Sequence, residues 1–563
     1  MKSFPLLVVA ALVAGLASAF VESRADMEVR NLCIDCQAAA GDSWINWTSE
    51  CSELAGENAP GLSCANFDVP LDYTEPESMT TLTLTLVKID AVQQPVKGSI
   101  LFNPGGPGDS GVQAVISQGQ TLMTLTGGHY NIVGFDPRGV NQTLPFSCYS
   151  SDSQRKALSP FSPLANSSDA ATGQRFAASE ISAMHCLNNT QELGGLLGTA
   201  FVVRDMVRII DALGEDGLLR YYGVSWGTLL GATFAAMFPE RVDKVVLDGN
   251  INVHEYYAGW TEIESSINMD DTYAAVFSGC IAASNDCALA SSFASAEEMQ
   301  VAVDQFLAML KYNPVPYSSQ QGFQMATYDQ VKTAIVLALY NPSHWPWLAQ
   351  GFAEMMTGNF TGFFDAVSSF YNGPDTGDDD LEAGITCGDQ AFRAEALFQL
   401  EPLLTALGES SKFGGLDFGT DNGFACSRWK VKAKEVYSGN FQVKTKNPVL
   451  LVGNTYDPVT PLASAWNTSA GFDGSVVLQH HGYGHTSAAQ PSLCTVDAIR
   501  AYFDSGILPA PGTICEPDVP LYGYENLTEA SGSNGTARSI FRRREEDLAI
   551  LAALSDLADA ILP

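Results

Sequence analysis

The segment Gly223-Val-Ser-Trp-Gly227 places a serine between two glycines where an apolar run changes into a helix-like pattern. The run Arg220–Val224 has the character of a buried strand, and helical spacing begins at Thr228. In such a strand–turn–helix setting the serine stands exposed above a sheet, at a helix N-terminus that favours negative charge. We therefore predict that Ser225 is a nucleophile. An ordinary serine in a glycine-rich turn is the alternative, which this setting disfavours.

A serine hydroxyl is a weak nucleophile, so it needs a base, and the base needs an acid to orient it. The sequence holds seven histidines, and His485 follows the last predicted strand, at the end where a base is needed. Asp457 follows the strand before it, although an acid ahead of Pro458 is also typical of a turn. The order Ser225, Asp457, His485, each just past a strand, predicts a catalytic triad.

A metal site is the competing interpretation of the histidines near the C-terminus. His480 and His481 lie close to His485, but they fit better as the end of the strand. No carboxylate nearby has ligand-like spacing, so we expect no metal and no cofactor.

Acyl transfer also needs hydrogen-bond donors for a developing oxyanion. The loop Asn103–Gly108 follows a short apolar strand, and its small residues let backbone N–H groups approach a substrate oxygen. We predict that the N–H groups of Gly106 and Trp226 form this oxyanion hole. The alternative is a plain glycine- and proline-rich loop.

Short apolar runs that end in turn residues alternate with helical segments from Gly98 to Gly249, and the pattern returns at Pro448. Strands buried on both faces and separated by helices predict a mostly parallel sheet with helices on both sides. Between the two regions the apolar spacing is mostly helical. The expected division is a signal peptide at 1–19, an N-terminal core part at 20–249, a helical cap insertion at 250–440, a C-terminal core part at 441–515 and a tail at 516–563.

Composition narrows the class of protein further. The chain carries 63 acidic and 29 basic side chains, a formal net charge of −34, with 46% hydrophobic residues. This balance is typical of a globular protein, and it argues against binding to nucleic acid or to an anionic membrane surface.

The start of the chain and its cysteines predict secretion. Met1-Lys2, a short apolar run and Ala17-Ser-Ala19 have the pattern of a cleavable signal, whereas a membrane anchor would need a longer run. The 12 cysteines favour disulfides, mainly between sequence neighbours such as Cys280–Cys287 and Cys494–Cys515. N-linked glycans are expected at eight sequons, namely Asn46, Asn141, Asn166, Asn188, Asn359, Asn467, Asn526 and Asn534.

Five motifs resemble the α/β-hydrolase serine peptidases of the tripeptidyl aminopeptidase and prolyl iminopeptidase group. They are Asn103–Gly108, Gly134–Gly139, Gly223–Gly227, Asp457–Pro461 and Gly484-His485. The resemblance implies an α/β-hydrolase fold, a Ser225–His485–Asp457 triad and peptide substrates with free N-termini. It also implies a carboxylate that holds the substrate ammonium group; Asp389, in a Cys-x-Asp segment, is the candidate, with a loop acid beside a disulfide as the alternative.

Two other functions stay open at this point. A carboxylesterase or lipase-like hydrolase would use the same triad on a different leaving group. A non-catalytic binding protein on the same scaffold is disfavoured, because all three triad positions are filled.

Overall fold

The structure is a computed structural model that describes residues 43–55, 61–158, 162–190, 192–259, 263–319, 322–371, 379–522 and 545–560. These residues lie in one compact unit, Ala40–Pro563. The signal peptide expected at 1–19 lies outside the described residues, as do Cys33, Cys36, Asn526 and Asn534.

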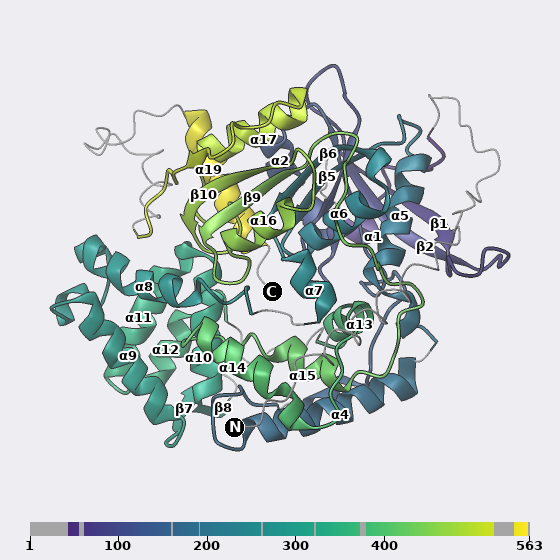
Figure 1. Cartoon of the computed structure of the whole chain (residues 1–563). Coiled ribbons are helices and arrows are strands. Elements are labelled where there is room, and N and C mark those ends of the chain that lie inside the picture. The colour runs from purple at the N-terminus through teal and green to yellow at the C-terminus, as the bar shows by residue number, and fades with distance from the viewer. Residues whose placement is uncertain are drawn as a thin grey trace, which may run out of the picture. The chain divides into compact units, whose positions relative to one another are not determined.

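Among the described residues, nine strands form one sheet in the order β1-β2-β4-β3-β5-β6-β9-β10-β11 (Figure 1). Strand β2 pairs antiparallel with β1 and β4, and the other pairs are parallel. The predicted mostly parallel sheet is therefore confirmed. The strands are β1 (Leu62–Pro70), β2 (Thr81–Ile89), β3 (Ser99–Asn103), β4 (Asn131–Phe135), β5 (Leu219–Val224), β6 (Val242–Asp248), β9 (Leu450–Tyr456), β10 (Val476–Tyr483) and β11 (Ile514–Cys515).

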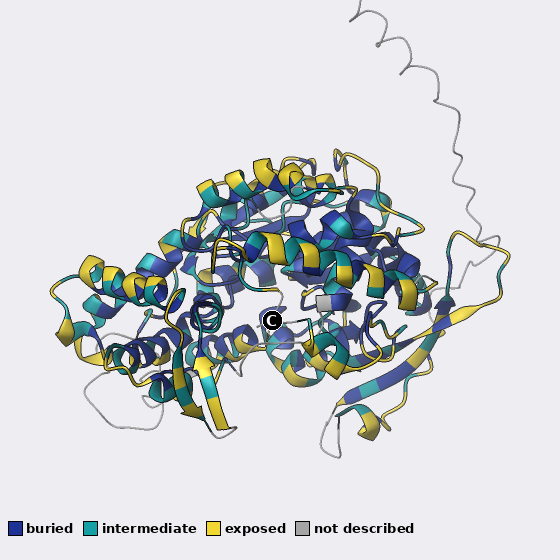
Figure 2. Cartoon of the chain, turned by 90° about the horizontal axis from the view of Figure 1, so that it is seen from below, coloured by how far each residue is buried: buried dark blue, intermediate teal, exposed yellow. Residues whose placement is uncertain are grey.

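Helices cover both faces of the sheet because successive strand residues point to opposite sides. On β3, Leu101 joins the core beneath α5 (Thr199–Ala212), α6 (Trp226–Met237), α7 (Val253–Ala258) and α16 (Leu462–Ser469). Its neighbours Ile100 and Phe102 join the opposite core beneath α2 (Gly111–Leu125), α17 (Leu493–Ser505) and α19 (Glu545–Asp559). In Figure 2 the buried residues fill the interior, and the exposed residues lie on the outer sides of the surface helices.

The segment 250–440 supplies no strand to the large sheet within its described residues. After α7 it contains a group of helices, α8 to α12, that lie together in Figure 1. Their buried side chains form an apolar core of their own. Its elements are α8 (Met269–Ala283), α9 (Ala296–Leu310), the hairpin β7 (Val315–Ser319) and β8 (Gly322–Ala326), α10 (Tyr328–Tyr340), α11 (Trp345–Met356), α12 (Phe360–Ala366), α13 (Asp379–Asp389), α14 (Glu401–Ser410) and α15 (Asp421–Arg428). The exact division at 250 and 440 stays a prediction.

The helical segment before β5 and the two ends of the chain complete the architecture. Helix α4 (Ala171–Thr190) packs against α15, and α1 (Ser52–Ala55) and α3 (Asp152–Lys156) are short. Near the C-terminus, Leu554 and Leu557 of α19 are buried in the core that contains α2. The C-terminal apolar run is therefore a helix packed on the body of the protein rather than a loose tail.

Five disulfides join cysteines among the described residues, and each connects two cysteines with no other cysteine between them in the sequence. The expected pairs Cys280–Cys287 and Cys494–Cys515 are confirmed. The others are Cys51–Cys64, Cys148–Cys186 and Cys387–Cys426.

Candidate active site

Ser225 forms the turn between β5 and α6. Its backbone has φ 54° and ψ −124°, a left-handed conformation that costs a non-glycine residue about 1–3 kcal/mol. The flanking glycines explain how the turn closes, because a Cβ on Gly223 would lie 2.4 Å from the carbonyl oxygen of Gly227. A Cβ on Gly227 would in turn lie 2.7 Å from the carbonyl oxygen of Asn103. Both glycines are therefore required by close backbone contacts.

The loop after β3 passes directly beside this turn. A Cβ on Gly105 would lie 2.9 Å from Ser225 Cβ and 3.2 Å from the Trp226 nitrogen. Gly105 and Gly106 both have positive φ, 117° and 97°, and the buried Asn103 side chain accepts the Gly105 N–H at 3.2 Å. The structure thus brings Gly106 and Trp226, the two predicted oxyanion donors, to the same cavity as Ser225.

Asp457 and His485 are directly hydrogen-bonded. The His485 Nδ1 atom lies 3.2 and 3.1 Å from the two carboxylate oxygens of Asp457. The Thr460 hydroxyl donates to Asp457 Oδ2 at 2.8 Å and lies 3.0 Å from His485 Nδ1. Backbone N–H groups of Val459, Thr460 and Thr486 also donate to this carboxylate. These contacts orient the imidazole ring from its Nδ1 side.

The electrostatics of Asp457 follow from the same contacts. Burial alone would raise the pKa of its carboxyl group, because a charge is poorly solvated there. The charge and hydrogen bond of His485, together with the N–H groups of Thr486 and Thr460, outweigh burial and hold the pKa below its ordinary value. Asp457 is therefore ionised at neutral pH.

The loop that carries His485 is held from two further sides. On β9, the amide of Asn454 donates to the carbonyl oxygens of Gly484 and Thr486, at 2.7 and 3.1 Å. On the insertion, the carbonyl oxygen of Tyr340 accepts the His485 N–H at 2.7 Å, and the two rings meet edge to face with centroids 5.1 Å apart. The helical segment thus supports the histidine directly.

Among the described residues, no hydrogen bond joins the Oγ atom of Ser225 to the Nε2 atom of His485. Such bonds often form only once a substrate is bound. Ser225 nevertheless lines a cavity together with Pro458, Val459 and Thr460, which belong to the Asp457 loop, and with Tyr340, which contacts His485. All three predicted triad residues therefore converge on one region of the sheet edge.

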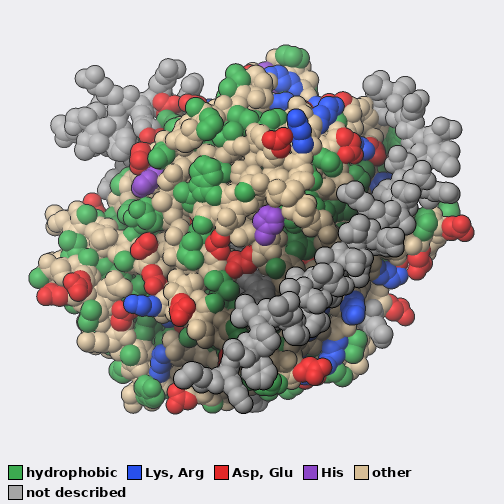
Figure 3. Space-filling view, in the orientation of Figure 1, with side chains coloured by type: hydrophobic (Ala, Val, Ile, Leu, Met, Phe, Trp, Pro, Cys, Tyr) green, Lys and Arg blue, Asp and Glu red, His purple; other side chains and the backbone are tan. Residues whose placement is uncertain are grey.

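The cavity has a volume of about 570 Å³ and is rich in acidic side chains. Asp380 and Asp421 are paired with Arg155 and Arg175. The acidic residues in its lining are Glu255, Asp380, Glu382 and Asp421, and the basic one is Arg175. On the face seen in Figure 3, acidic side chains elsewhere are spread in small groups rather than in one continuous patch.

Glu255, on α7, also lines this cavity, and its carboxylate is held by backbone N–H groups rather than by an Arg or Lys side chain among the described residues. Its two carboxylate oxygens accept the Glu264 N–H, at 3.4 and 3.1 Å. Burial raises the pKa of Glu255 to about 7, and the neighbouring charge of Glu264 acts in the same direction. A cation that entered the cavity would stabilise the ionised form of Glu255. Glu255 carries no motif that marks it in the sequence; its place on the first helix after β6 is the one signal that points to it.

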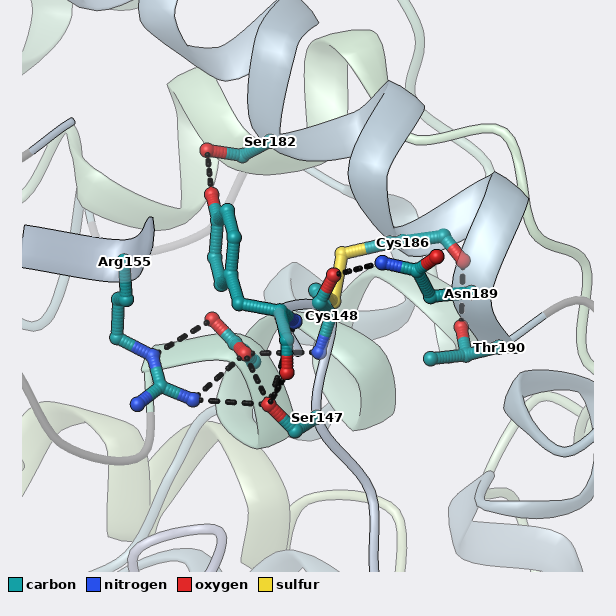
Figure 4. The surroundings of a disulfide bond; sticks show 9 residues. Ser147, Cys148, Arg155, Ser182, Cys186, Asn189 and Thr190 are labelled. Carbon is teal, nitrogen blue, oxygen red and sulfur yellow. Dashed lines mark hydrogen bonds and ion pairs between the residues drawn. A yellow bond between two sulfur atoms is a disulfide. The ribbon is translucent and has the colours of Figure 1, made fainter. Parts of the chain in front are cut away.

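A disulfide fixes one wall of the cavity (Figure 4). Cys148 is bonded to Cys186 on α4, and Asn189 of the same helix donates to the Cys148 carbonyl oxygen at 2.7 Å. The Tyr149 hydroxyl donates to Ser182 at 2.9 Å. Since Ser182 and Cys186 line the cavity, the cross-link holds α4 in place as part of its wall.

Asp389, the sequence candidate for an ammonium anchor, lies elsewhere. It is buried and is absent from the cavity lining. Its carboxylate accepts bonds from the Thr199 N–H and hydroxyl and from the Tyr256 hydroxyl, at 3.1, 2.5 and 3.1 Å. Burial raises its pKa to about 6. Tyr256 does line the cavity, so Asp389 stands one side chain behind the wall.

Two further findings concern the described residues only. They include no group of three or more His, Cys, Asp or Glu side chains arranged to hold a metal ion. None of the helices described is long and apolar enough to cross a membrane.

Residues 98–274, which include Ser225, match the family described as alpha/beta hydrolase fold. Residues 416–515, which include Asp457 and His485, match the family described as TAP-like protein. Together with the parallel sheet and the strained serine turn, these matches define the class of the protein. It has the α/β-hydrolase fold and is a serine hydrolase.

Similar proteins of known name extend over most of the chain. The serine protease Hip1 of Mycobacterium tuberculosis is 26% identical over 505 residues, which cover 84% of this chain and 91% of that protein. The tripeptidyl aminopeptidase of Streptomyces lividans is 28% identical over 546 residues, or 91% and 96% of the two chains. Carboxylesterase B of Mycobacterium tuberculosis is 27% identical over 494 residues, or 84% and 90%. The predicted resemblance to tripeptidyl aminopeptidases is confirmed.

Proposed function

We propose that this protein is a secreted serine aminopeptidase that releases residues or short peptides from free N-termini. The observation that carries the proposal is a single cavity lined by both Ser225 and Glu255. A nucleophile and a carboxylate in the lining of one cavity suit a substrate that has a reactive carbonyl and a nearby ammonium group.

The proposed chemistry proceeds through an acyl-enzyme. His485 takes the proton of the Ser225 hydroxyl while the oxygen attacks the carbonyl carbon of the scissile amide. The N–H groups of Gly106 and Trp226 stabilise the oxyanion. His485 then gives the proton to the leaving amine, and a water molecule, activated by the same histidine, hydrolyses the ester to Ser225. Asp457 holds the ring and stabilises its charged form.

We propose Glu255 as the group that binds the substrate ammonium. Asp389 is less suited to direct contact, because it lies behind the lining and its carboxylate already accepts three hydrogen bonds. We assign Asp389 an indirect role, which is to fix the hydroxyl of Tyr256 in the cavity wall. The net charge of −34 would favour the approach of cationic N-termini and oppose that of acidic peptides.

A carboxylesterase is the second candidate function. It is favoured by the likeness to carboxylesterase B, and it would use the same triad and oxyanion loop. It would not require Glu255, since an ester substrate carries no ammonium group to hold.

Three substrates distinguish the two functions. They are a short peptide p-nitroanilide with a free amino terminus, the same peptide N-acetylated, and a p-nitrophenyl ester of a short acid. The aminopeptidase hypothesis predicts rapid cleavage of the free peptide and little cleavage of the acetylated one. Efficient ester cleavage without turnover of either anilide would instead identify an esterase.

Secretion and glycosylation are further parts of the proposal. The five disulfides favour an oxidising compartment. The asparagines of the six sequons that the structure describes are all exposed. Expression in a eukaryotic host should yield a product that begins after residue 19 and loses mass on treatment with an N-glycosidase; an intact N-terminus with no change in mass would contradict this. We propose no nucleic-acid or membrane partner.

A further inference from the structure

We propose that Asp248, at the end of β6, is a positioning residue that clamps the loop carrying His485 to the strand beside the Ser225 turn. This inference rests on the proposed function, since it assumes that Ser225 and His485 react together. Asp248 does not contact the imidazole, whose acid is Asp457, so its role would be exerted through the loop.

The clamp is formed by Ser487, two residues after His485. Its N–H donates to Asp248 Oδ1 at 3.0 Å, and its hydroxyl donates to Asp248 Oδ2 at 2.5 Å. Asp248 is 1% exposed, so these bonds form away from water and have no competing solvent partner. Two bonds from one residue fix both the position and the direction of the loop.

Asp248 also makes hydrogen bonds with the turn and the strand that carry the nucleophile. Its backbone carbonyl oxygen accepts the Ser225 N–H at 3.1 Å. Its carboxylate also accepts the hydroxyl of Tyr222, on β5, at 2.9 Å. A single residue therefore connects the strand that precedes Ser225, the Ser225 turn and the loop of His485.

The neighbouring residue leaves little room for movement. Gly249 has φ 71°, and a Cβ there would lie 2.8 Å from Thr486 Cγ2 and 3.1 Å from Thr460 Oγ1. These two threonines flank the base and its acid. The end of β6 thus packs directly against the Asp457–His485 pair, so a shift of Ser487 would be transmitted to the ring.

Two carboxylates consequently hold successive residues of this loop. Asp457 accepts the imidazole of His485 and the N–H of Thr486, and Asp248 accepts both donors of Ser487. Burial raises the pKa of Asp248, and the charge of Asp457 adds to this effect. Keeping an acid in such an unfavourable place is consistent with a specific task for its two acceptor oxygens.

The test compares three single variants, and the double variant Asp248→Asn/Ser487→Ala, with the wild type. Asp248→Asn weakens the clamp, and Ser487→Ala removes one of its two bonds. Ser99→Ala is the matched control. Ser99 lies at the start of β3, and its buried hydroxyl also donates to a carboxylate, that of Glu215, at 2.7 Å. For each variant kcat and KM are measured per active site, with active sites titrated by a fluorophosphonate, and thermal unfolding is recorded.

Since a displacement of about 1 Å can cost about 10²-fold in rate, we expect kcat to fall by about 10- to 100-fold in Asp248→Asn and by about 5- to 10-fold in Ser487→Ala. KM should stay within about twofold, since substrate contacts are unchanged, and Ser99→Ala should keep its kcat. The double variant should be no slower than Asp248→Asn alone, because the residues act through one contact.

The inference would be overturned if Ser487→Ala and Asp248→Asn both kept a kcat per titrated site within twofold of the wild type. It would also be overturned if the two losses of kcat multiplied in the double variant. If Asp248→Asn does not fold, Ser487→Ala decides alone. Failure of the wild type to react with the fluorophosphonate would overturn the proposed function itself, which separates the two results.

Discussion

The carboxylate of Asp457 lies 3.1 Å from the imidazole Nδ1 of His485, although strand β10 and 28 positions separate the two residues. Their loops meet because β9 and β10 are parallel neighbours, so both strands end at the same edge of the sheet. The pair therefore lies at the carboxyl ends of the strands, where the turn of Ser225 also lies.

Asp457→Asn should lower kcat by about 10³- to 10⁴-fold, since an amide cannot hold the ring in the tautomer that the reaction needs. KM should change little, because Asp457 is fully buried and absent from the cavity lining. Steady-state kinetics on a peptide anilide measure both constants. A loss of less than tenfold would show that another group orients His485.

Thr460→Val keeps the shape of the side chain and removes the hydroxyl that lies between Asp457 and His485. A hydrogen bond of this kind contributes about 1 kcal/mol, so we expect kcat to fall by roughly five- to tenfold. Thr126→Val is the control, since that buried hydroxyl, just after α2, donates to the carbonyl oxygens of Leu122 and Met123 in the helix. Equal kcat values in the two variants would contradict a role for Thr460.

Gly105→Ala should impair the oxyanion loop. The added methyl group would meet Ser225 Cβ at 2.9 Å and the carbonyl oxygen of Val224 at 2.8 Å, so the loop must move away from the nucleophile. Losing one oxyanion donor typically lowers kcat by about 10²- to 10³-fold. Gly322→Ala is the control. Gly322, in the β7–β8 hairpin, also has a positive φ, but nothing lies near the added Cβ. This variant therefore shows the effect of backbone strain without displacement of the oxyanion loop. An active Gly105→Ala enzyme would argue against the Gly106 donor.

Glu255→Gln should weaken binding of free N-termini by about 10- to 100-fold, as expected for losing a bond to a charged group. The pKa of Glu255 is about 7, so ammonium binding by wild type should weaken as the pH falls through this value. The measurement is the ratio of kcat/KM for free and N-acetylated peptides, in which any pH dependence common to both substrates cancels. The ratio should fall with pH in wild type and stay low and flat in Glu255→Gln; parallel curves would refute the assignment.

Stability gives an independent check of the same group. A carboxyl whose pKa is raised in the folded state binds its proton more tightly there than in the unfolded chain. The folded wild type should therefore lose stability relative to Glu255→Gln as the pH rises from the ordinary carboxyl range to about 7. Thermal unfolding of both proteins across this window measures the difference. No divergence would mean that Glu255 titrates normally.

The sheet and the serine turn could be predicted from the sequence because local signals determine them. The apolar runs that end at Val224 and Val452 both form buried strand, although β9 continues to Tyr456. The glycines around Ser225 are required by close backbone contacts. Local signals also favour His485 over His480 as the base, because the apolar run before His480 predicts that it belongs to a strand, and it lies within β10.

The contents of the cavity could not be predicted in this way. Whether an acid on a helix points into a cavity depends on how helices far apart in the chain pack. This packing produces no periodic pattern in the sequence. Asp389 belongs to a recognisable Cys-x-Asp segment but lies behind Tyr256, whereas Glu255 belongs to no motif and lies in the lining. Asp248 ends β6 and belongs to none of the motifs, and only the fold brings Ser487 to it.

The covalent product of a fluorophosphonate tests the central claim most directly. The wild-type protein is inactivated, digested, and analysed by mass spectrometry to find the modified residue, with His485→Ala treated in parallel. We predict one adduct, on Ser225, formed far more slowly in His485→Ala. Modification at another residue, or an equal rate at Ser225 without His485, would contradict the proposed catalytic triad.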